Sequence, residues 1–237
     1  MMKVFVSGAD RGLGSALTEK MLERGFTVFA GQFMPDWPEL DALVKKYPTT
    51  LKIIPLDVTS DTSVEQAAKL VTELTDQLDV LIGNAGIMGW LADVMPTITD
   101  TQMMADVYNV NVIGNVRLVE HFLPLLEKGT TRKICIMTSE AGSITTYGRP
   151  TLHWYSSTKA ALNHYTKTLF NRYRQDDFKF RLYHPGWINT YMNGVLETKA
   201  HYDSPEAADM SMDYFFDAVV DEDQLVLYTC EKEIMPF

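Results

Sequence analysis

Seven short apolar runs recur along this chain, and segments with the spacing of amphipathic helices separate them. The runs lie at residues 3–7, 27–31, 51–56, 79–83, 133–138, 180–184 and 225–229. Runs as short and apolar as these are typical of strands that are buried on both faces of a sheet. Strands that alternate with helices form parallel sheets, because right-handed crossovers place the helices on the faces. The pattern predicts an α/β fold, with a doubly wound, seven-stranded parallel sheet flanked by helices.

The helical segments are bounded by recognisable start and stop signals. They lie at residues 13–24, 62–77, 100–127, 155–174 and 204–220. The tripeptide Ser204-Pro205-Glu206 predicts that Ser204 caps the last helix and that proline occupies its first position. Two stretches, 142–151 and 189–204, are the longest without periodicity, and long loops in this architecture lie where ligands bind.

Composition limits the class of protein. The chain has 237 residues, of which 46% are hydrophobic, so it can bury one full core, and we expect a single domain over residues 1–237. A formal charge of −10 argues against nucleic acid or an anionic membrane as partner. Cys135 and Cys230 both lie in apolar stretches, which favours buried thiols in a reducing compartment. Without a signal peptide or a membrane-spanning run, we expect a cytoplasmic protein.

Three glycines stand between the first predicted strand and the first predicted helix, at Gly8, Gly12 and Gly14. The amides at a helix N-terminus favour an anion, and the crevice beyond the strand ends is where this fold binds ligands. The alternative is a tight turn in which the glycines serve only helix–strand packing. The position favours a site for a dinucleotide pyrophosphate, although the spacing differs from G-x-G-x-x-G.

Two Tyr-x-x-x-Lys sequences occur, Tyr155 with Lys159 and Tyr228 with Lys232. The first is in a predicted helix, where residues four apart lie on one face about 6 Å apart. We expect the second to be extended, which separates the same positions by about 13 Å. Tyr155 can act as an acid or base for carbonyl chemistry if the neighbouring Lys159 ammonium lowers its pKa. The alternative is an ordinary helix surface with a solvated lysine.

Four motifs follow the predicted strands in order along nearly the whole chain. They are Ser7-Gly8-x-x-x-Gly12-x-Gly14, Gly83-Asn84-Ala85-Gly86, Tyr155-x-x-x-Lys159 and Pro185-Gly186-x-x-x-Thr190. Together they resemble the signature of the short-chain dehydrogenase/reductase family, with Ser7 in place of a threonine. The resemblance implies a Rossmann-like fold and an NAD(P)-dependent oxidoreductase that interconverts a carbonyl and a secondary alcohol. The last ten residues faintly resemble the tail of small cytosolic carbonyl reductases.

The resemblance also implies a catalytic group and a cofactor site. The implied catalytic residues are Asn111, Ser139, Tyr155 and Lys159. The implied cofactor-binding residues are Gly8, Asp10, Arg11, Gly12, Leu13, Gly14, Gln32, Asp57, Val58, Asn84, Ala85, Gly86, Tyr155, Lys159, Pro185, Gly186, Ile188 and Thr190. In this scheme Ser139 polarises the carbonyl, Asn111 binds a water that relays protons, and Lys159 holds the ribose. Asn84 is expected to stabilise the sheet rather than to take part in chemistry.

Three of these assignments leave alternatives open. Ser139 stands farther before Tyr155 than is usual in the family, and Ser143 is the competing candidate, although Ser139 directly follows a strand. Asn111 matches better than Asn109, because a glycine follows it at the family's spacing. The NAD-specific acidic residue after the second strand is replaced by Gln32, and Arg11 favours NADP, although Asp10 offsets part of its charge.

The sequence also suggests a substrate class, an oligomeric state and alternative functions. We expect a small carbonyl or alcohol as substrate, covered by the segment that contains Tyr191, Met192 and Leu196. The resemblance implies a homodimer or homotetramer through helices 100–127 and 155–174. The scattered histidines show no metal-ligand spacing, so no metal is expected. The rival functions are a non-catalytic nucleotide-binding or signalling homologue and, less favoured, an epimerase or dehydratase that retains NAD.

Overall fold

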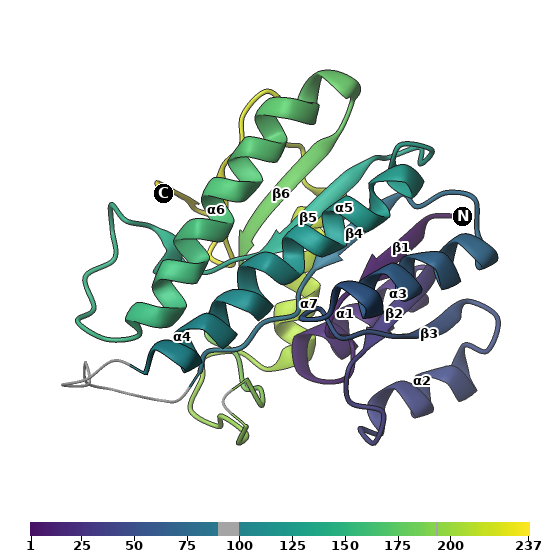
Figure 1. The fold of residues 1–237 in the computed structure, drawn as a ribbon, viewed down its shortest axis with the longest axis horizontal. Coiled ribbons are helices and arrows are strands. Elements are labelled where there is room, and N and C mark those ends of the chain that lie inside the picture. Colours follow the sequence, from purple (N-terminus) through teal and green to yellow (C-terminus); the bar gives the residue numbers. More distant parts are fainter. Residues whose placement is uncertain (90–99, 193) are drawn as a thin grey trace.

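One mixed sheet organises the molecule (Figure 1). The computed structural model describes residues 1–89, 100–192 and 194–237. The strand order is β3-β2-β1-β4-β5-β6-β7-β8. The strands are β1 (Lys3–Val6), β2 (Thr27–Gln32), β3 (Leu51–Pro55), β4 (Val80–Gly83), β5 (Lys133–Met137), β6 (Lys179–His184), β7 (Leu227–Thr229) and β8 (Ile234–Met235). The order reverses between β1 and β4, and the carboxyl ends of strands at such a point form the ligand crevice of doubly wound folds.

Helices cover both faces of the sheet. They are α1 (Gly12–Glu23), α2 (Glu39–Lys46), α3 (Asp61–Leu74), α4 (Thr101–Tyr108), α5 (Gly114–Leu126), α6 (His153–Tyr173) and α7 (Ser204–Met212). Shorter 3₁₀ turns lie at Glu140–Gly142 and Arg174–Asp176. One hydrophobic cluster joins the sheet to α3, α5 and α6, and a second joins it to α1, α2 and α7. The predicted α/β, doubly wound architecture is confirmed.

The strand count was wrong by one. β1 to β7 are parallel, as predicted, but β8 pairs antiparallel with β7 through Tyr228 and Leu227. β8 is only two residues long and Ile234 is largely exposed, so it lacks the apolar run that marks a buried strand.

The helices differ from the prediction in three ways. The segment 100–127 is interrupted by a π-helical turn, Asn109–Ile113, which is common at functional sites. The segment after α7 likewise becomes a π turn at Asp213–Asp217, so the α-helix ends well before residue 220. The sequence analysis missed α2, which has eight residues and buries only Leu40 and Leu43.

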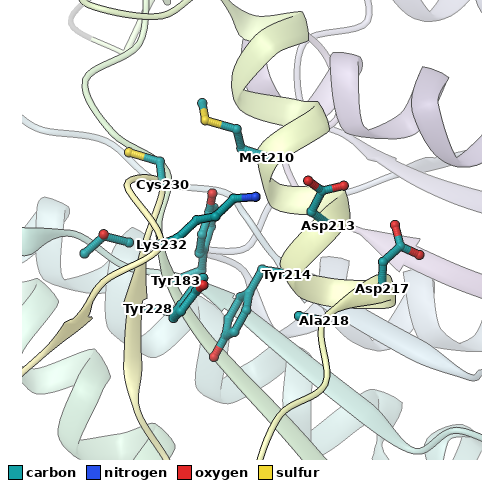
Figure 2. A pocket seen from close by; sticks show the side chains of 10 residues that line it. Tyr183, Met210, Asp213, Tyr214, Asp217, Ala218, Tyr228, Cys230 and Lys232 are labelled. Carbon is teal, nitrogen blue, oxygen red and sulfur yellow. The ribbon is translucent and has the colours of Figure 1, made fainter.

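The geometry predicted for the second tyrosine–lysine pair was also wrong. The chain turns back between β7 and β8, and Lys232 sits in that turn with φ of 65°. As a result Tyr228 and Lys232 both line a cavity of about 230 Å³, and Figure 2 shows Lys232 extending toward Asp213. The lining comes from β6, α7, the π turn after it and the hairpin, and it does not include Tyr155 or Lys159.

The N-terminal cap of α7 is Asp203 and not the predicted Ser204. The Asp203 carboxylate accepts a hydrogen bond from the Glu206 amide (2.8 Å), and the Glu206 side chain accepts one from the Asp203 amide (3.1 Å). This reciprocal pair is a capping box, and it satisfies two amides that the helix itself leaves free.

The cap can be tested by unfolding. Asp203→Ala should lower the free energy of unfolding by about 1 kcal/mol, because the cap of α7 is lost. The neighbouring variant Ser204→Ala removes only a long hydrogen bond to the Asn189 carbonyl (3.3 Å) and should cost less. Urea titration of both variants measures the difference, and a larger loss in Ser204→Ala would restore Ser204 as the cap.

Candidate active site

Ser7 fixes the turn that follows β1. Its hydroxyl accepts hydrogen bonds from the amides of Asn84 and Ala85, both at 3.0 Å, and donates to the Ile82 carbonyl at 3.4 Å. The Asn84 side-chain amide donates to the carbonyls of Ser7 (2.9 Å) and Gly8 (3.0 Å). These bonds tie the ends of β1 and β4 together, and they give Asn84 the structural role that the sequence analysis expected.

The glycines are required because backbone segments approach closely here. A Cβ at Gly14 would lie 2.0 Å from the Gly8 carbonyl oxygen, and one at Gly8, where φ is +62°, would lie 2.9 Å from Ala85 Cα. Since α1 begins at Gly12, the first-turn amides of the helix have no partner within it. A turn with glycines at its points of close approach that leads into free helical amides fits a dinucleotide pyrophosphate.

The segment after β6 returns to this turn. Gly186, with φ of +83°, has Cys230 and Tyr202 so close that a Cβ would lie 2.8 Å from each, and Ile188 pairs with Tyr202 in an isolated bridge. Thr190 then lies against the glycine turn, because a Cβ at Gly12 would be 3.3 Å from its methyl group. The motif that starts at Pro185 is therefore brought next to the first motif.

The remaining residues predicted for the cofactor lie at the ends of β2 and β3. Gln32 is the last residue of β2, and Leu13 is buried in the first turn of α1. Asp57 accepts hydrogen bonds from the Thr59 amide (2.8 Å) and hydroxyl (2.7 Å). Val58 packs against Gly114, where a Cβ would lie 2.9 Å from Val58 Cβ. These contacts hold the strand ends in place, and the binding roles of these residues stay predictions.

Tyr155 and Lys159 lie on one face of α6, as predicted. Both are almost fully buried, with 8% and 4% of their surfaces exposed. The Lys159 ammonium is 5.5 Å from the centre of the Tyr155 ring and donates to the Met137 carbonyl at the end of β5 (2.9 Å). The helix therefore presents a phenol and an ammonium side by side at the carboxyl end of the sheet.

Asn111 lies in the π turn and faces the same region. Its side chain accepts from the Ile87 amide (2.8 Å) and donates to the Ile87 carbonyl (2.8 Å) and the Thr158 hydroxyl (3.0 Å). Asn111 and Lys159 converge at Gly86, where a Cβ would lie 3.3 Å from Asn111 Oδ1 and 3.8 Å from Lys159 Nζ. Asn111 thus holds the segment after β4 against α6, and its place in a proton relay stays a prediction.

The two candidate serines differ in their contacts. Ser139 lies two residues after β5, its hydroxyl accepts a hydrogen bond from the Ala141 amide (3.1 Å), and its proximity to Tyr155 acts to lower the pKa of the phenol. Ser143 is bound elsewhere: its hydroxyl donates to the Pro236 carbonyl and accepts from the Thr146 hydroxyl (2.8 Å). The contacts favour Ser139 as the partner of Tyr155 and make Ser143 an anchor for the C-terminal tail.

Comparison with known proteins places this geometry in a family. The family model described as short chain dehydrogenase matches residues 2–201. The chain belongs to the short chain dehydrogenase family. An uncharacterized oxidoreductase of Schizosaccharomyces pombe is 34% identical over 85% of this chain and 79% of its own length.

Solved structures show the same similarity. The NADPH-bound carbonyl reductase from chicken fatty liver aligns with a TM-score of 0.88 and 31% identity over 100% of this chain and 99% of its own. A Pseudomonas aeruginosa carbonyl reductase in complex with NADP aligns with a TM-score of 0.84 and 26% identity over the whole of both chains. The predicted resemblance to this family, near the carbonyl reductases, is confirmed.

Burial controls the titration of Tyr155 and Lys159 in this short chain dehydrogenase. It raises the pKa of Tyr155 to about 12, with smaller upward contributions from Glu140 and Tyr147, and the neighbouring Ser139 only partly opposes this rise. Burial also lowers the pKa of Lys159 to about 8. The expectation that Lys159 brings the Tyr155 pKa below its ordinary value is wrong for this structure, because desolvation of the phenolate is the larger effect.

Sequence reasoning missed several contacts of this site. Thr158 donates to the Tyr155 carbonyl (2.7 Å) and accepts from Asn111, so it joins the π turn to α6. Trp37 lies over the Arg11 guanidinium at 4.7 Å. Neither residue belongs to a motif, and only the adjacency of Thr158 to Lys159 could have drawn attention to it. Among the described residues no trio of His, Cys, Asp or Glu is placed to hold a metal, and no helix is suited to crossing a bilayer.

The anchoring role of Ser143 predicts a stability effect. Ser143→Ala should lower the free energy of unfolding by about 0.5–1.5 kcal/mol, because the hydrogen bonds to the Pro236 carbonyl and the Thr146 hydroxyl are lost. Ser139→Ala, which removes one hydrogen bond from the Ala141 amide, should cost less. Chemical unfolding measures the loss in both variants. A larger loss of unfolding free energy in Ser139→Ala than in Ser143→Ala would show that Ser143 does not anchor the tail.

Proposed function

We propose that this chain is an NADP(H)-preferring oxidoreductase that interconverts a carbonyl and a secondary alcohol, with Tyr155 as the acid and base. The observation that carries the proposal is the buried pair of Tyr155 and Lys159 on α6, beside Ser139 and next to Gly86. The similarity to the chicken and Pseudomonas carbonyl reductases, which bind NADPH and NADP, supports the cofactor and the substrate class.

The glycine turn and the neighbouring strand ends are the proposed cofactor site. Free amides at the start of α1 would bind the pyrophosphate, and Arg11 would bind the 2′-phosphate. Thr190 and the backbone near Ile188 would bind the carboxamide, and Lys159 the ribose. When bound, the nicotinamide supplies or accepts the hydride.

The chain's own groups manage the proton. With a pKa near 12, the Tyr155 phenol keeps its proton throughout the physiological range and can donate it to a carbonyl oxygen. The Ser139 hydroxyl, two residues after β5, would supply a second donor to that oxygen and stabilise developing negative charge. Protonated Lys159 favours the phenolate that remains after transfer. These roles suit reduction of the carbonyl at neutral pH.

The decisive experiment measures NADPH oxidation with a panel of ketones and aldehydes. Tyr155→Phe should reduce turnover at least about 100-fold, because general acid catalysis is lost while the ring stays in place. Tyr173→Phe, near the far end of α6, is the matched control and should retain turnover. Cofactor binding without turnover in the unmodified protein would favour the non-catalytic nucleotide-binding alternative.

The pH dependence of reduction follows from Lys159. Its pKa of about 8 means that the ammonium is lost as pH rises through that value, while the Tyr155 phenol remains protonated until about pH 12. The kcat/KM for NADPH should therefore fall about tenfold per pH unit above pH 8. In Lys159→Arg this decline should disappear, since guanidinium keeps its charge. A profile of the unmodified protein that is flat to pH 10 would contradict the assignment.

A further inference from the structure

Arg11 contacts two aromatic rings that come from distant parts of the chain and lie side by side next to its guanidinium. Its guanidinium carbon is 4.7 Å from the centre of the Trp37 ring and 5.7 Å from that of Tyr191. Its Nη2 donates to the Tyr191 carbonyl at 3.3 Å. The two rings meet each other edge to face, 5.0 Å between centres. We call this group the Arg11 stack.

The Arg11 stack connects the two halves of the proposed cofactor site. Arg11 immediately precedes α1, Trp37 lies between β2 and α2, and Tyr191 directly follows Thr190. The region after β2 serves the adenosine ribose in folds of this kind, whereas the region after β6 serves the nicotinamide in the proposal above. A displacement of Arg11 would therefore change the packing both after β2 and after β6.

Arg11 is the sole cation in the two segments at the adenosine end. Residues 7–14 and 32–38 contain no other lysine or arginine. The neighbouring acid, Asp10, accepts hydrogen bonds from the amides of Phe33 (2.6 Å) and Met34 (2.9 Å), so its charge is used to hold the loop after β2. An anion that binds in this region has Arg11 as its cationic partner.

The packing of Arg11 leaves it able to bind a phosphate. A guanidinium has five N–H donors in one plane, and one of them binds the Tyr191 carbonyl. Both rings lie on one side of the guanidinium, because their centres are only 5.0 Å apart. A planar cation that already rests against two rings loses less side-chain freedom on binding than a free one. Trp37 is the better partner of the two rings, because indole is the aromatic group that attracts a cation most strongly.

We propose that Trp37 and Tyr191 are positioning residues that hold Arg11 in place for the 2′-phosphate of NADP(H) and thereby set the preference for NADP(H) over NAD(H). The inference rests on the proposed cofactor site. It assigns a part in cofactor choice to two residues outside the glycine motif, whose rings contact Arg11 and each other.

Equilibrium binding tests this independently of turnover. The probes are NADPH, NADH and adenosine 2′,5′-bisphosphate, which carries the 2′-phosphate without a nicotinamide. Trp37→Leu should weaken NADPH and the bisphosphate about tenfold and leave NADH within about twofold, since the lost contact acts on the phosphate through Arg11. Tyr191→Leu should show the same selectivity, and Trp37→Phe, which restores a ring face, should recover most of the loss.

Two further variants separate positioning from general damage. Phe33→Leu removes an exposed ring from the same loop and should leave all three affinities unchanged. Arg11→Met should abolish the preference for NADPH, and adding Trp37→Leu to it should cause no further loss, because both act through one group. Equal losses of NADPH and NADH in Trp37→Leu, no loss, or additive losses in the double variant would overturn the stack as a determinant.

The binding results also separate this inference from the proposed function. A protein that binds NADPH with the expected pattern but reduces no carbonyl would support the Arg11 stack and contradict the oxidoreductase. A protein that binds neither dinucleotide nor the bisphosphate would overturn both.

Discussion

The close contact between the turn after β1 and the end of β4 determines where everything else in the site can lie. Gly14 brings α1 so near to the Gly8 carbonyl that no side chain fits between them, and Ser7 and Asn84 bond the turn to the neighbouring strand. This contact places the free amides of α1 at the point where the strand order reverses. It also places Ala85 against Gly8 and Gly86 near Lys159, so the proposed nucleotide site and the proposed catalytic pair both border the segment after β4.

The site is supported by a second set of buried polar contacts, and its members come from four different elements. Asn111 from the π turn binds the segment after β4, Thr158 joins Asn111 to α6, and Lys159 reaches the Met137 carbonyl at the end of β5. Buried polar groups without partners cost free energy, so each bond also fixes the position of the element that supplies it. Tyr155 is held by the same arrangement, because Thr158 donates to its carbonyl.

The strands and helices that bury several residues each could be predicted from the sequence. Strands buried on both faces must be apolar throughout, and this is why β1 to β7 appeared as seven runs and the helices between them as amphipathic segments. Features that depend on a few residues were missed: β8 is short and exposed, and α2 buries only two leucines. The Asp203 cap was within reach, because the spacing of Asp203 and Glu206 is that of a capping box, but the adjacent Ser204-Pro205 drew the prediction one residue too far.

Less of the candidate site than of the fold could be predicted from the sequence. Motif spacing predicted that Tyr155 and Lys159 share a face, because helical geometry alone decides it. It could not predict the contact of Trp37 with Arg11, 26 positions away, the bond of Thr158 with Asn111, 47 positions away, or the bond of Ser143 with the tail, because these depend on the folded chain. The sequence analysis paired Arg11 with Asp10 alone, and its aromatic partners appear only when the loop after β2 and the segment after β6 meet.

The pKa of Tyr155 depends on burial, which the spacing of Tyr155 and Lys159 in the sequence could not predict. The sequence contains both partners, and the neighbouring ammonium favours the phenolate. Burial, however, disfavours the charged form of each group, so it raises the pKa of the phenol and lowers that of the amine. The ordinary pKa of a tyrosine is slightly below that of a lysine. Burial raises the pKa of Tyr155 to about 12 and lowers that of Lys159 to about 8. The order of the two pKa values is therefore reversed, and Tyr155 is the weaker acid of the pair. In the proposed reduction, a neutral phenol beside an amine that is still largely protonated at neutral pH gives its proton to the carbonyl oxygen, and the phenolate left behind has its counter-ion already in place. Burial makes Tyr155 a poor base on its own, but in this proposal it also keeps the proton available for transfer. The proposed chemistry therefore depends on how completely α6 and the strand ends exclude water.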